Sequence, residues 1–345
     1  MILIIALVLF LALGPLDGST PAVPNRSVPN TAVPNMAVPH VNCTRFAAPG
    51  GSEASPGTRA RPYRTVQKLV DELDPGQTGC LRRGRYREAE VTIERPGVRL
   101  ASYPGSRAIL IGRLRVNAPR VKVSGLRLDG RNPRGLPSPT INADDVVFRA
   151  NDVSSRGGSS CFLLGGVTHV RHSVIVGNRI HNCGVIGSDL DHGIYMSHVD
   201  RARIVGNTIY DNASRGIKVG PDSQGALIRG NVIDGNPIGL TFSGDEDNTS
   251  SNNVVAHNVI SNSTGWWNVQ TYWPGEQGTG NVLRRNCLHG ANSDPHYNER
   301  GGVSDEPGFT SAGNVIAAPD YVNRGAKNYR LHPGSPCLQV YRPLR

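Results

Sequence analysis

Aromatic residues make up only 6% of this 345-residue chain, and long runs with helical periodicity are scarce. Glycine and proline, by contrast, number 41 and 25. The scarcity argues against a mainly helical protein, and the abundance of turn formers predicts many short strands joined by turns. The length would allow two average domains, but repeat and all-β architectures of this size often form one.

No Cys-x-x-Cys pair occurs, so neither a zinc ribbon nor thioredoxin-like chemistry is indicated. The chain has six cysteines, namely Cys43, Cys80, Cys161, Cys183, Cys287 and Cys337. An even number in an exported chain suggests disulfides, for which six cysteines allow about 15 pairings.

The chain also lacks an apolar run long enough to span a bilayer. Residues 2–13 are apolar, which is the length of a signal-peptide core, although the usual positive residues before it are missing. We therefore expect a signal peptide at 1–20 and a secreted, extracellular protein. Residues 21–42 repeat Val-Pro every five residues and predict a stiff linker, which leaves 43–345 as the folded domain.

The formal net charge is +10. A basic exported protein could favour nucleic acid, anionic lipid or an acidic polysaccharide, and general solubility explains the same charge. Charge alone therefore does not choose a partner.

An Asn-x-Ile/Val motif recurs along most of the chain at intervals of 24–29 residues, which predicts a repeated coil with loops of different length. It begins at Asn151, Asn178, Asn207, Asn231, Asn258 and Asn314, with Asn286-Cys-Leu between the last two. Stacked amides at one turn could hydrogen-bond along the coil axis, and asparagine tolerates the left-handed conformation that such a turn needs.

The segment before the repeat contains a short strand at 45–48, a loop, and an amphipathic stripe over 63–73 that predicts a helix. The order FAAPGGS, SPGT, RPYRTVQKLVDELDPGQTGC and YPGSRAIL resembles the entry segment of secreted right-handed parallel β-helix proteins of the pectate-lyase-like superfamily. That resemblance implies that the helix caps the open end of the coil. A cap is required because the first coil would otherwise expose its core and strand edges.

We therefore predict an all-β fold, a right-handed single-stranded parallel β-helix of roughly nine coils with an N-terminal capping helix. The segment 328–337 resembles the usual exit segment of these proteins and is expected to be a structural cap. The repeat favours the pairings Cys43–Cys80, Cys161–Cys183 and Cys287–Cys337.

One strand of the coil returns as Gly193-Ile-Tyr-Met, Gly216-Ile-Lys-Val and Gly239-Leu-Thr-Phe. Aligning the glycines predicts which side chains point outward. The outward rows are expected to be Tyr195, Lys218, Thr241 and Gln270, and one step earlier His192, Arg215, Ile238 and Trp267. Each outward side chain by itself is ordinary on a solvated sheet, but His192, Tyr195, Arg215 and Lys218 crowd two adjacent coils.

These residues suit a lyase or epimerase acting on a uronate polysaccharide. A cation neutralises the uronate carboxylate, and a base removes the proton beside it. We assign catalytic roles to Lys218 as base, to His192 and Tyr195 as partner acid or base, and to Arg215 and Asp191; substrate-binding roles go to Asp189, Trp267, Gln270 and Tyr272. Asp200, Asp222 and Asp245 fall in equivalent turns and suggest part of a calcium site, with turn formation as the structural alternative.

Members of the same superfamily include polysaccharide lyases, uronan epimerases and glycoside hydrolases. Hydrolysis needs two carboxylates flanking the bond, and the outward strand positions lack such a pair. A non-catalytic cell-surface glycan-binding or adhesive protein is the alternative, because fold alone does not carry function. We expect an acidic polysaccharide as partner of a monomer, without nucleic acid and without a membrane beyond the signal peptide.

Overall fold

The computed structural model describes residues 41–291 and 295–343. The predicted signal peptide and all but the end of the predicted linker lie outside these ranges. No helix within the described ranges has the length and apolarity needed to cross a membrane.

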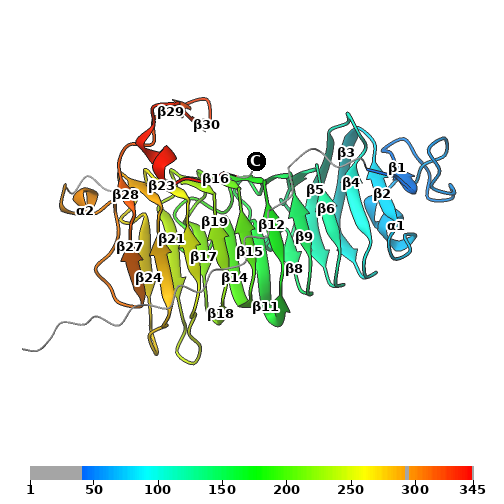
Figure 1. Cartoon of the computed structure of the whole chain (residues 1–345). Coiled ribbons are helices and arrows are strands. Elements are labelled where there is room, and N and C mark those ends of the chain that lie inside the picture. The colour runs from blue at the N-terminus through cyan, green and yellow to red at the C-terminus, as the bar shows by residue number, and fades with distance from the viewer. Residues whose placement is uncertain (1–40, 292–294, 344–345) are drawn as a thin grey trace, which may run out of the picture. The chain divides into compact units, whose positions relative to one another are not determined.

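Parallel strands stack coil upon coil along the described chain (Figure 1). One sheet contains eleven of them, β1 (Arg45–Ala47), β2 (Thr78–Leu81), β4 (Arg99–Ser102), β6 (Lys122–Ser124), β9 (Val147–Arg149), β12 (Val174–Val176), β15 (Arg203–Val205), β19 (Leu227–Arg229), β22 (Val254–Ala256), β25 (Asn281–Arg284) and β27 (Phe309–Ala312). The second sheet contains seventeen strands and forms two ladders.

The first ladder follows the repeated asparagines and contains β7 (Arg127–Asp129), β10 (Asp152–Ser154), β13 (Arg179–His181), β16 (Thr208–Tyr210), β20 (Val232–Asp234), β23 (Val259–Ser261), β26 (Cys287–His289) and β28 (Val315–Ile316). The other, called the site ladder below, contains β8 (Thr140–Ile141), β11 (Phe162–Arg171), β14 (Ile194–Asp200), β17 (Arg215–Val219), β18 (Ser223–Gln224), β21 (Ile238–Ser243) and β24 (Val269–Tyr272). Strands β3 (Gly84–Ile93) and β5 (Ala108–Val116) contribute to both. The predicted solenoid of about nine turns is confirmed.

Alternating side chains of these strands fill the interior of the coil. Ile194, Ile217, Leu240 and Val269 occupy one register position on successive coils, and all four are fully buried. Because each coil repeats the same apolar positions, the core is a continuous column, which explains how a chain with few aromatic residues builds a sizeable interior.

The repeated asparagines form the predicted ladder of side-chain amides. The amide of Asn207 donates from Nδ2 to Oδ1 of Asn231 at 3.0 Å and to the Ile175 carbonyl at 2.9 Å, and its main-chain N–H donates to the same Oδ1 at 2.8 Å. One prediction is wrong in detail. The left-handed conformation belongs to the residue before the asparagine, such as Gly206 or Gly230, each with φ of 64°.

The N-terminal helix is α1, Val66–Asp71, shorter than the predicted 63–73. Thr65 caps its first turn by accepting a hydrogen bond from the Lys68 N–H, and Glu88 of β3 accepts from the Val66 N–H at 2.7 Å. Its buried face, which includes Leu69, joins the core column and is therefore in keeping with a cap. A second short helix, α2, spans Pro295–Glu299.

The C-terminal segment forms a hairpin of β29 (Tyr321–Asn323) and β30 (Asn328–Leu331), followed by a 3-10 helix over Pro336–Gln339. The Arg324 guanidinium pairs with the fully buried Asp234 carboxylate, Nε to Oδ2 at 2.8 Å. This contact and the disulfide at Cys337 hold the segment against the coil.

All three predicted disulfides are present, Cys43–Cys80, Cys161–Cys183 and Cys287–Cys337, with Cα–Cα distances of 5.6, 5.4 and 5.2 Å. No free cysteine remains in the described ranges. Disulfides persist in oxidising compartments, so they point to a location outside the cytoplasm.

Candidate functional site

The two outward rows lie in the register that the glycine alignment predicts. Strand pairing sets Tyr195 beside Lys218, Lys218 beside Thr241, and Thr241 beside Gln270. In the other row, Arg215 pairs with Ile238. His192 and Trp267 occupy the equivalent positions on the flanking coils. The N–H of Gly193, next to His192, donates to the Arg215 carbonyl, and the N–H of Gly239, next to Ile238, donates to the Trp267 carbonyl.

The glycines explain why both rows face outward. A Cβ at Gly216 would lie 2.7 Å from the Gly239 carbonyl oxygen and 2.8 Å from the Ile233 methyl group, so a side chain there would enter the core. The backbone thus places two consecutive positions, Gly216 and Ile217, toward the interior. Arg215 and Lys218 on either side then both project from the same face.

Tyr195 is the centre of the cluster. The Lys218 ammonium lies 5.1 Å from the centroid of its ring, within the range of a cation–π contact. The His192 ring meets it edge to face, with centroids 5.3 Å apart. The three side chains therefore form one packed group that joins β14, β17 and His192, two residues before β14.

Arg215 is positioned by the loop of residues 184–191. Its Nη1 donates to the Asp189 carbonyl at 2.7 Å and to the Ser214 hydroxyl at 2.9 Å. Asp189 is exposed, and its negative charge also attracts the guanidinium. Asp189 thus contacts the cluster through its main chain, a role that a sequence pattern does not reveal.

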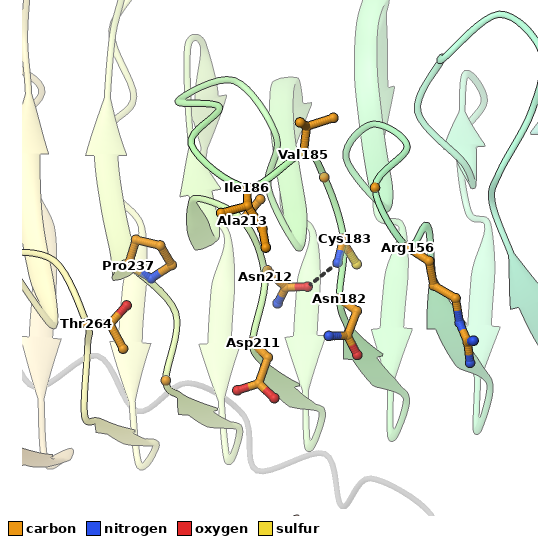
Figure 2. Close-up of a pocket in the computed structure, with 13 residues that line it drawn as sticks. Arg156, Asn182, Cys183, Val185, Ile186, Asp211, Asn212, Ala213, Pro237 and Thr264 are labelled. Carbon is orange, nitrogen blue, oxygen red and sulfur yellow. Dashed lines mark hydrogen bonds between the residues drawn. The ribbon is translucent and has the colours of Figure 1, made fainter.

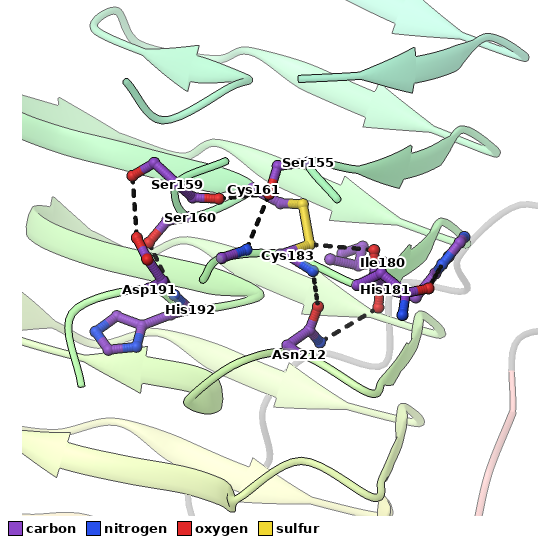
Figure 3. Close-up of a disulfide and its surroundings, with 12 residues drawn as sticks. Ser155, Ser159, Ser160, Cys161, Ile180, His181, Cys183, Asp191, His192 and Asn212 are labelled. Carbon is purple, nitrogen blue, oxygen red and sulfur yellow. Dashed lines mark hydrogen bonds between the residues drawn. A yellow bond between two sulfur atoms is a disulfide. The ribbon is translucent and has the colours of Figure 1, made fainter. Parts of the chain in front are cut away.

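Asp191 faces the loop and not the cluster (Figure 3). Its carboxylate accepts hydrogen bonds from the Ser159 hydroxyl at 3.1 Å and from the Val185 N–H at 3.0 Å. Beside it, the Cys161–Cys183 disulfide links the start of the loop to the preceding coil. These contacts support a structural role for Asp191, which differs from the catalytic role expected from sequence.

Partial burial adjusts the acid–base properties of the cluster. Burial lowers the pKa of the Lys218 ammonium, and the neighbouring Arg215 charge lowers it further. Burial raises the pKa of the Tyr195 hydroxyl, so this group stays protonated at neutral pH. Burial and the charges of Arg215 and Lys218 hold the pKa of His192 well below 6.5, so its imidazole is neutral.

Aromatic side chains lie on β24 and just before it, two strands beyond β17 in the site ladder. Trp267 contacts Tyr297 of α2, with ring centroids 4.3 Å apart. Tyr272, at the end of β24, and Trp266, which comes directly before Trp267 in the chain, are 56% and 63% exposed, which leaves ring surface free for stacking. Gln270, on β24, continues the row that starts at Tyr195.

The three aspartates expected to form a metal-binding row do not share one register. Asp200 pairs with Gln224, and its carboxylate contacts His169 Nε2 at 3.2 Å. Asp245 accepts hydrogen bonds from the N–H groups of residues 247 and 248 and thus forms a turn. Within the described ranges, no group of three or more His, Cys, Asp or Glu side chains is arranged to hold a metal ion.

A cavity of about 900 Å³ lies over the turns that precede β17 and β21 (Figure 2). Val185, Ile186, Asn212, Ala213 and Pro237 are among its lining residues. The cavity does not include Lys218 or Tyr195, so we base the site on the side-chain cluster and not on the cavity.

The comparisons with known proteins agree with this architecture. A family model described as "Periplasmic copper-binding protein (NosD)" matches residues 141–291, less than half of the chain. Pectate lyase Pel9A is similar over 86% of this chain and 91% of that one, with 14% identity and a TM-score of 0.61. The chain folds as a pectate-lyase-like right-handed parallel β-helix.

Two further solved structures resemble this β-helix. One is XylC in complex with xylose, with a TM-score of 0.58 and 11% identity over 78% of this chain and 67% of that one. Another is the A-module of mannuronan C-5 epimerase AlgE4 of Azotobacter vinelandii, with a TM-score of 0.52 and 17% identity over 72% and 69%. At these identities the likeness concerns the fold. No curated protein sequence matches the chain.

Three buried polar atoms of the β-helix lie at the site without a hydrogen-bond partner in the described ranges. They are Nδ1 of His192, Nε of Arg215 and Oγ1 of Thr241. Buried polar groups are normally satisfied, so this cluster of unpaired atoms fits a surface that receives a polar ligand. Thr241 had been placed in the row from sequence without a role, and only its burial singles it out.

Acid should destabilise the β-helix through His192. The unfolded chain takes up a proton as the pH falls through about 6.5, whereas the buried imidazole does not, because its folded-state pKa is well below 6.5. Stability should therefore fall below pH 6.5 by up to about 1.4 kcal/mol per pH unit, until the folded-state pKa is reached.

The pH dependence of stability is to be compared between the wild type and His192→Phe. This variant keeps an aromatic ring beside Tyr195 but cannot take up a proton. Urea unfolding between pH 7 and pH 4.5 should show a shallower acid loss in this variant than in the wild type. Identical pH slopes for the two proteins would contradict a buried, neutral His192.

Proposed function

We propose that this protein is a carbohydrate-active enzyme outside the cytoplasm, a lyase or C5-epimerase of an acidic, uronate-containing polysaccharide. The observation that carries the proposal is the packing of the partly buried Lys218 against a protonated Tyr195, with a second partly buried cation, Arg215, on the same strand. The fold it shares with a pectate lyase and a mannuronan epimerase supports the same class.

Arg215 is suited to receive the uronate carboxylate. A guanidinium stays protonated even when burial lowers its pKa, and its planar fork matches a carboxylate. The hydrogen bond from Nη1 to the Asp189 carbonyl fixes its orientation, and Nε has no hydrogen-bond partner among the described residues. Neutralising the carboxylate makes the adjacent C5 proton easier to remove, because negative charge develops there as the proton leaves.

Lys218 is suited to take that proton. Its lowered pKa increases the fraction of neutral amine, which is the form that can accept a proton. It is the next outward position after Arg215 on β17, so a carboxylate held by Arg215 would bring the neighbouring carbon toward the amine. The C5–H bond breaks, its electron pair stays on the sugar, and the proton moves to Nζ.

Tyr195 is suited to complete either reaction as an acid, because its hydroxyl stays protonated. In a lyase it would protonate the glycosidic oxygen while the C4–O bond breaks and a C4–C5 double bond forms. In an epimerase it would return a proton to C5 on the opposite face. His192 would act as a positioning residue that holds the Tyr195 ring through the edge-to-face contact.

Trp267, Gln270 and Tyr272 extend the site toward β24 and would contact neighbouring sugars. Asp189 would take part through its carbonyl contact with Arg215. A glycoside hydrolase is less well supported, because the outward positions of the site ladder from β14 to β24 are Tyr, Lys, Thr and Gln, without a carboxylate pair.

A non-catalytic glycan-binding protein is the second candidate. The exposed rings of Trp266 and Tyr272 favour it, since flat rings stack on sugars and need no chemistry to bind. Saturable binding without turnover, lost in Trp267→Ala, would select this alternative.

The test is to incubate the purified protein with alginate, pectate and glycosaminoglycans. An unsaturated product would be followed by ultraviolet absorbance and the C5 configuration by NMR. Product formed from at least one uronate polymer, and absent with a neutral glucan, is the expected result. Turnover of the neutral glucan alone would overturn the proposal.

The pH dependence of turnover should report Lys218. The rate should rise with pH as the ammonium loses its proton, at a pH below the ordinary lysine value of about 10.5, and fall when Tyr195 ionises. In Arg215→Gln, loss of the neighbouring charge should raise the pKa of Lys218 and move the rising limb to higher pH. A rising limb that stays in place would contradict the assignment of Lys218 as base.

A further inference from the structure

A second hollow lies at the entry end of the β-helix, on coils far from the candidate site. Its volume is about 780 Å³, and its lining includes Pro49, Arg82, Arg83, Arg85 and Tyr103. Arg82 and Arg83 lie in the turn that joins β2 to β3, Arg85 lies at the start of β3, and Pro49 comes from the loop that follows β1.

The turn that carries Arg82 and Arg83, and the start of β3 that carries Arg85, are held by several hydrogen bonds. The hydroxyl of the buried Tyr86 donates to the carbonyls of Ala47 and Arg82 at 2.8 and 2.9 Å, and the Arg82 N–H donates to Ala47 at 2.9 Å. A Cβ at Gly84 would lie 2.5 Å from Cγ of Pro49, which shows how closely the turn packs on the opposite wall. The backbone below the charges is therefore fixed before any ligand binds.

The charges in the hollow have no ion-pair partner within the described part of the chain. Arg82, Arg83 and Arg85 are exposed, and none of them makes an ion pair with a carboxylate of the described residues. On the next coils the situation differs, since Arg113 and Arg115 both pair with Glu90. Three unpaired guanidinium groups around one hollow attract anions.

An aromatic ring completes the hollow. The guanidinium carbon of Arg59 lies 5.5 Å from the centroid of Tyr103, and Phe46 supports the ring from 6.1 Å. A ring that accepts a cation on its face also suits the face of a sugar. We propose that this hollow, formed by Arg82, Arg83, Arg85 and Tyr103, is a second binding site that holds an anionic polysaccharide chain through its carboxylate or sulfate groups.

The hollow is separate from the candidate site. From β3, five steps of strand pairing through β5, β8, β11 and β14 lead to β17. At a strand spacing of about 4.8 Å, the two strands are ~24 Å apart along the coil axis. A polymer held here would stay on the protein whether or not it occupies the candidate site, so the inference does not depend on the proposed function.

A polysaccharide fits the hollow better than nucleic acid does. Proteins that bind single strands stack successive bases on several aromatic rings, whereas among the described residues only the Tyr103 ring lines this hollow. Readout of a duplex uses a helix or a two-stranded ribbon that enters a groove, and this surface is a turn.

The test uses the full protein with Arg82, Arg83 and Arg85 all changed to Gln. The matched control changes Arg201, Arg284 and Arg330 to Gln, which removes the same charge from exposed positions elsewhere on the β-helix. Binding to heparin and to alginate is measured by titration in low and high salt, together with binding to duplex DNA.

The hollow variant should bind heparin and alginate about tenfold more weakly in low salt, with a shallower salt dependence, because three charge contacts act together. The control triple variant should bind as the wild type does. Equal weakening in the two triple variants would overturn the proposal in favour of overall charge. Weakened binding to DNA alone would overturn it in favour of a nucleic acid.

Discussion

Replacing Lys218 with alanine is expected to lower turnover of the uronate polymer by about a thousandfold, because the amine assigned to take the proton next to the carboxylate is then missing. The substrate should still bind, since Arg215 and the aromatic side chains remain. The effect should therefore appear in kcat and much less in KM.

Lys122→Ala provides a matched control for Lys218→Ala. Lys122 is an exposed lysine on β6, in the other sheet, and its loss removes the same charge from a strand. Turnover should be unchanged within a factor of about two in this control. Full activity in Lys218→Ala would contradict the assignment of Lys218 as the base, whichever uronate polymer the protein acts on.

Replacing Asn231 with alanine is expected to destabilise the β-helix by about 3–5 kcal/mol. Asn231 is fully buried, and its Nδ2 donates to the Ile204 carbonyl at 2.8 Å and to Asn258 Oδ1 at 2.9 Å. Its own Oδ1 accepts from both the N–H and the Nδ2 of Asn207. Alanine would leave several buried polar groups unsatisfied on two coils at once.

The control for this prediction is Asn142→Ala, because Asn142 is half-buried and donates from Nδ2 to Asn117 Oδ1 on the neighbouring coil at 2.9 Å. Water can replace that hydrogen bond, so the cost should stay below about 1.5 kcal/mol. Urea unfolding followed by circular dichroism would measure both. Equal losses in the two variants would contradict the buried amide ladder as a main source of stability.

Much of the fold could be predicted because one coil imposes the same demands on every repeat. The asparagine amides must bond to their neighbours, and Gly193, Gly216 and Gly239 must leave room for the core, so the same residues recur at fixed positions. That register predicted the outward rows and the three disulfides. The left-handed position was misplaced by one residue, because glycine and asparagine both tolerate it.

The candidate site could be predicted only where side chains belong to strands. Lys218 and Tyr195 follow from strand register, but the contact of Arg215 with the Asp189 carbonyl depends on how the loop of 184–191 folds back. The aspartates failed to align for a similar reason. Strand β14 runs unbroken to Asp200, whereas the chain leaves β17 at Val219 and starts β18 at Ser223. In loops of unequal length, the repeat does not predict which residues lie side by side.

The hollow at Arg82, Arg83 and Arg85 had no signal in the repeat, because it lies before the regular coils begin. Its three arginines looked like part of the general positive charge of the chain. The structure shows that they line one hollow together with Tyr103, because the hydrogen bonds of Tyr86 hold the turn in place.

The central claim is that the cluster of Arg215, Lys218 and Tyr195 removes the C5 proton of a uronate. Its most direct test is a reaction in D₂O with a uronate polymer, followed by NMR at C5. The wild type should either incorporate deuterium at C5 or form a C4–C5 double bond, and Lys218→Ala should do neither above background. Saturable binding of the polymer by the wild type, with every C5 proton retained and no double bond formed, would contradict it.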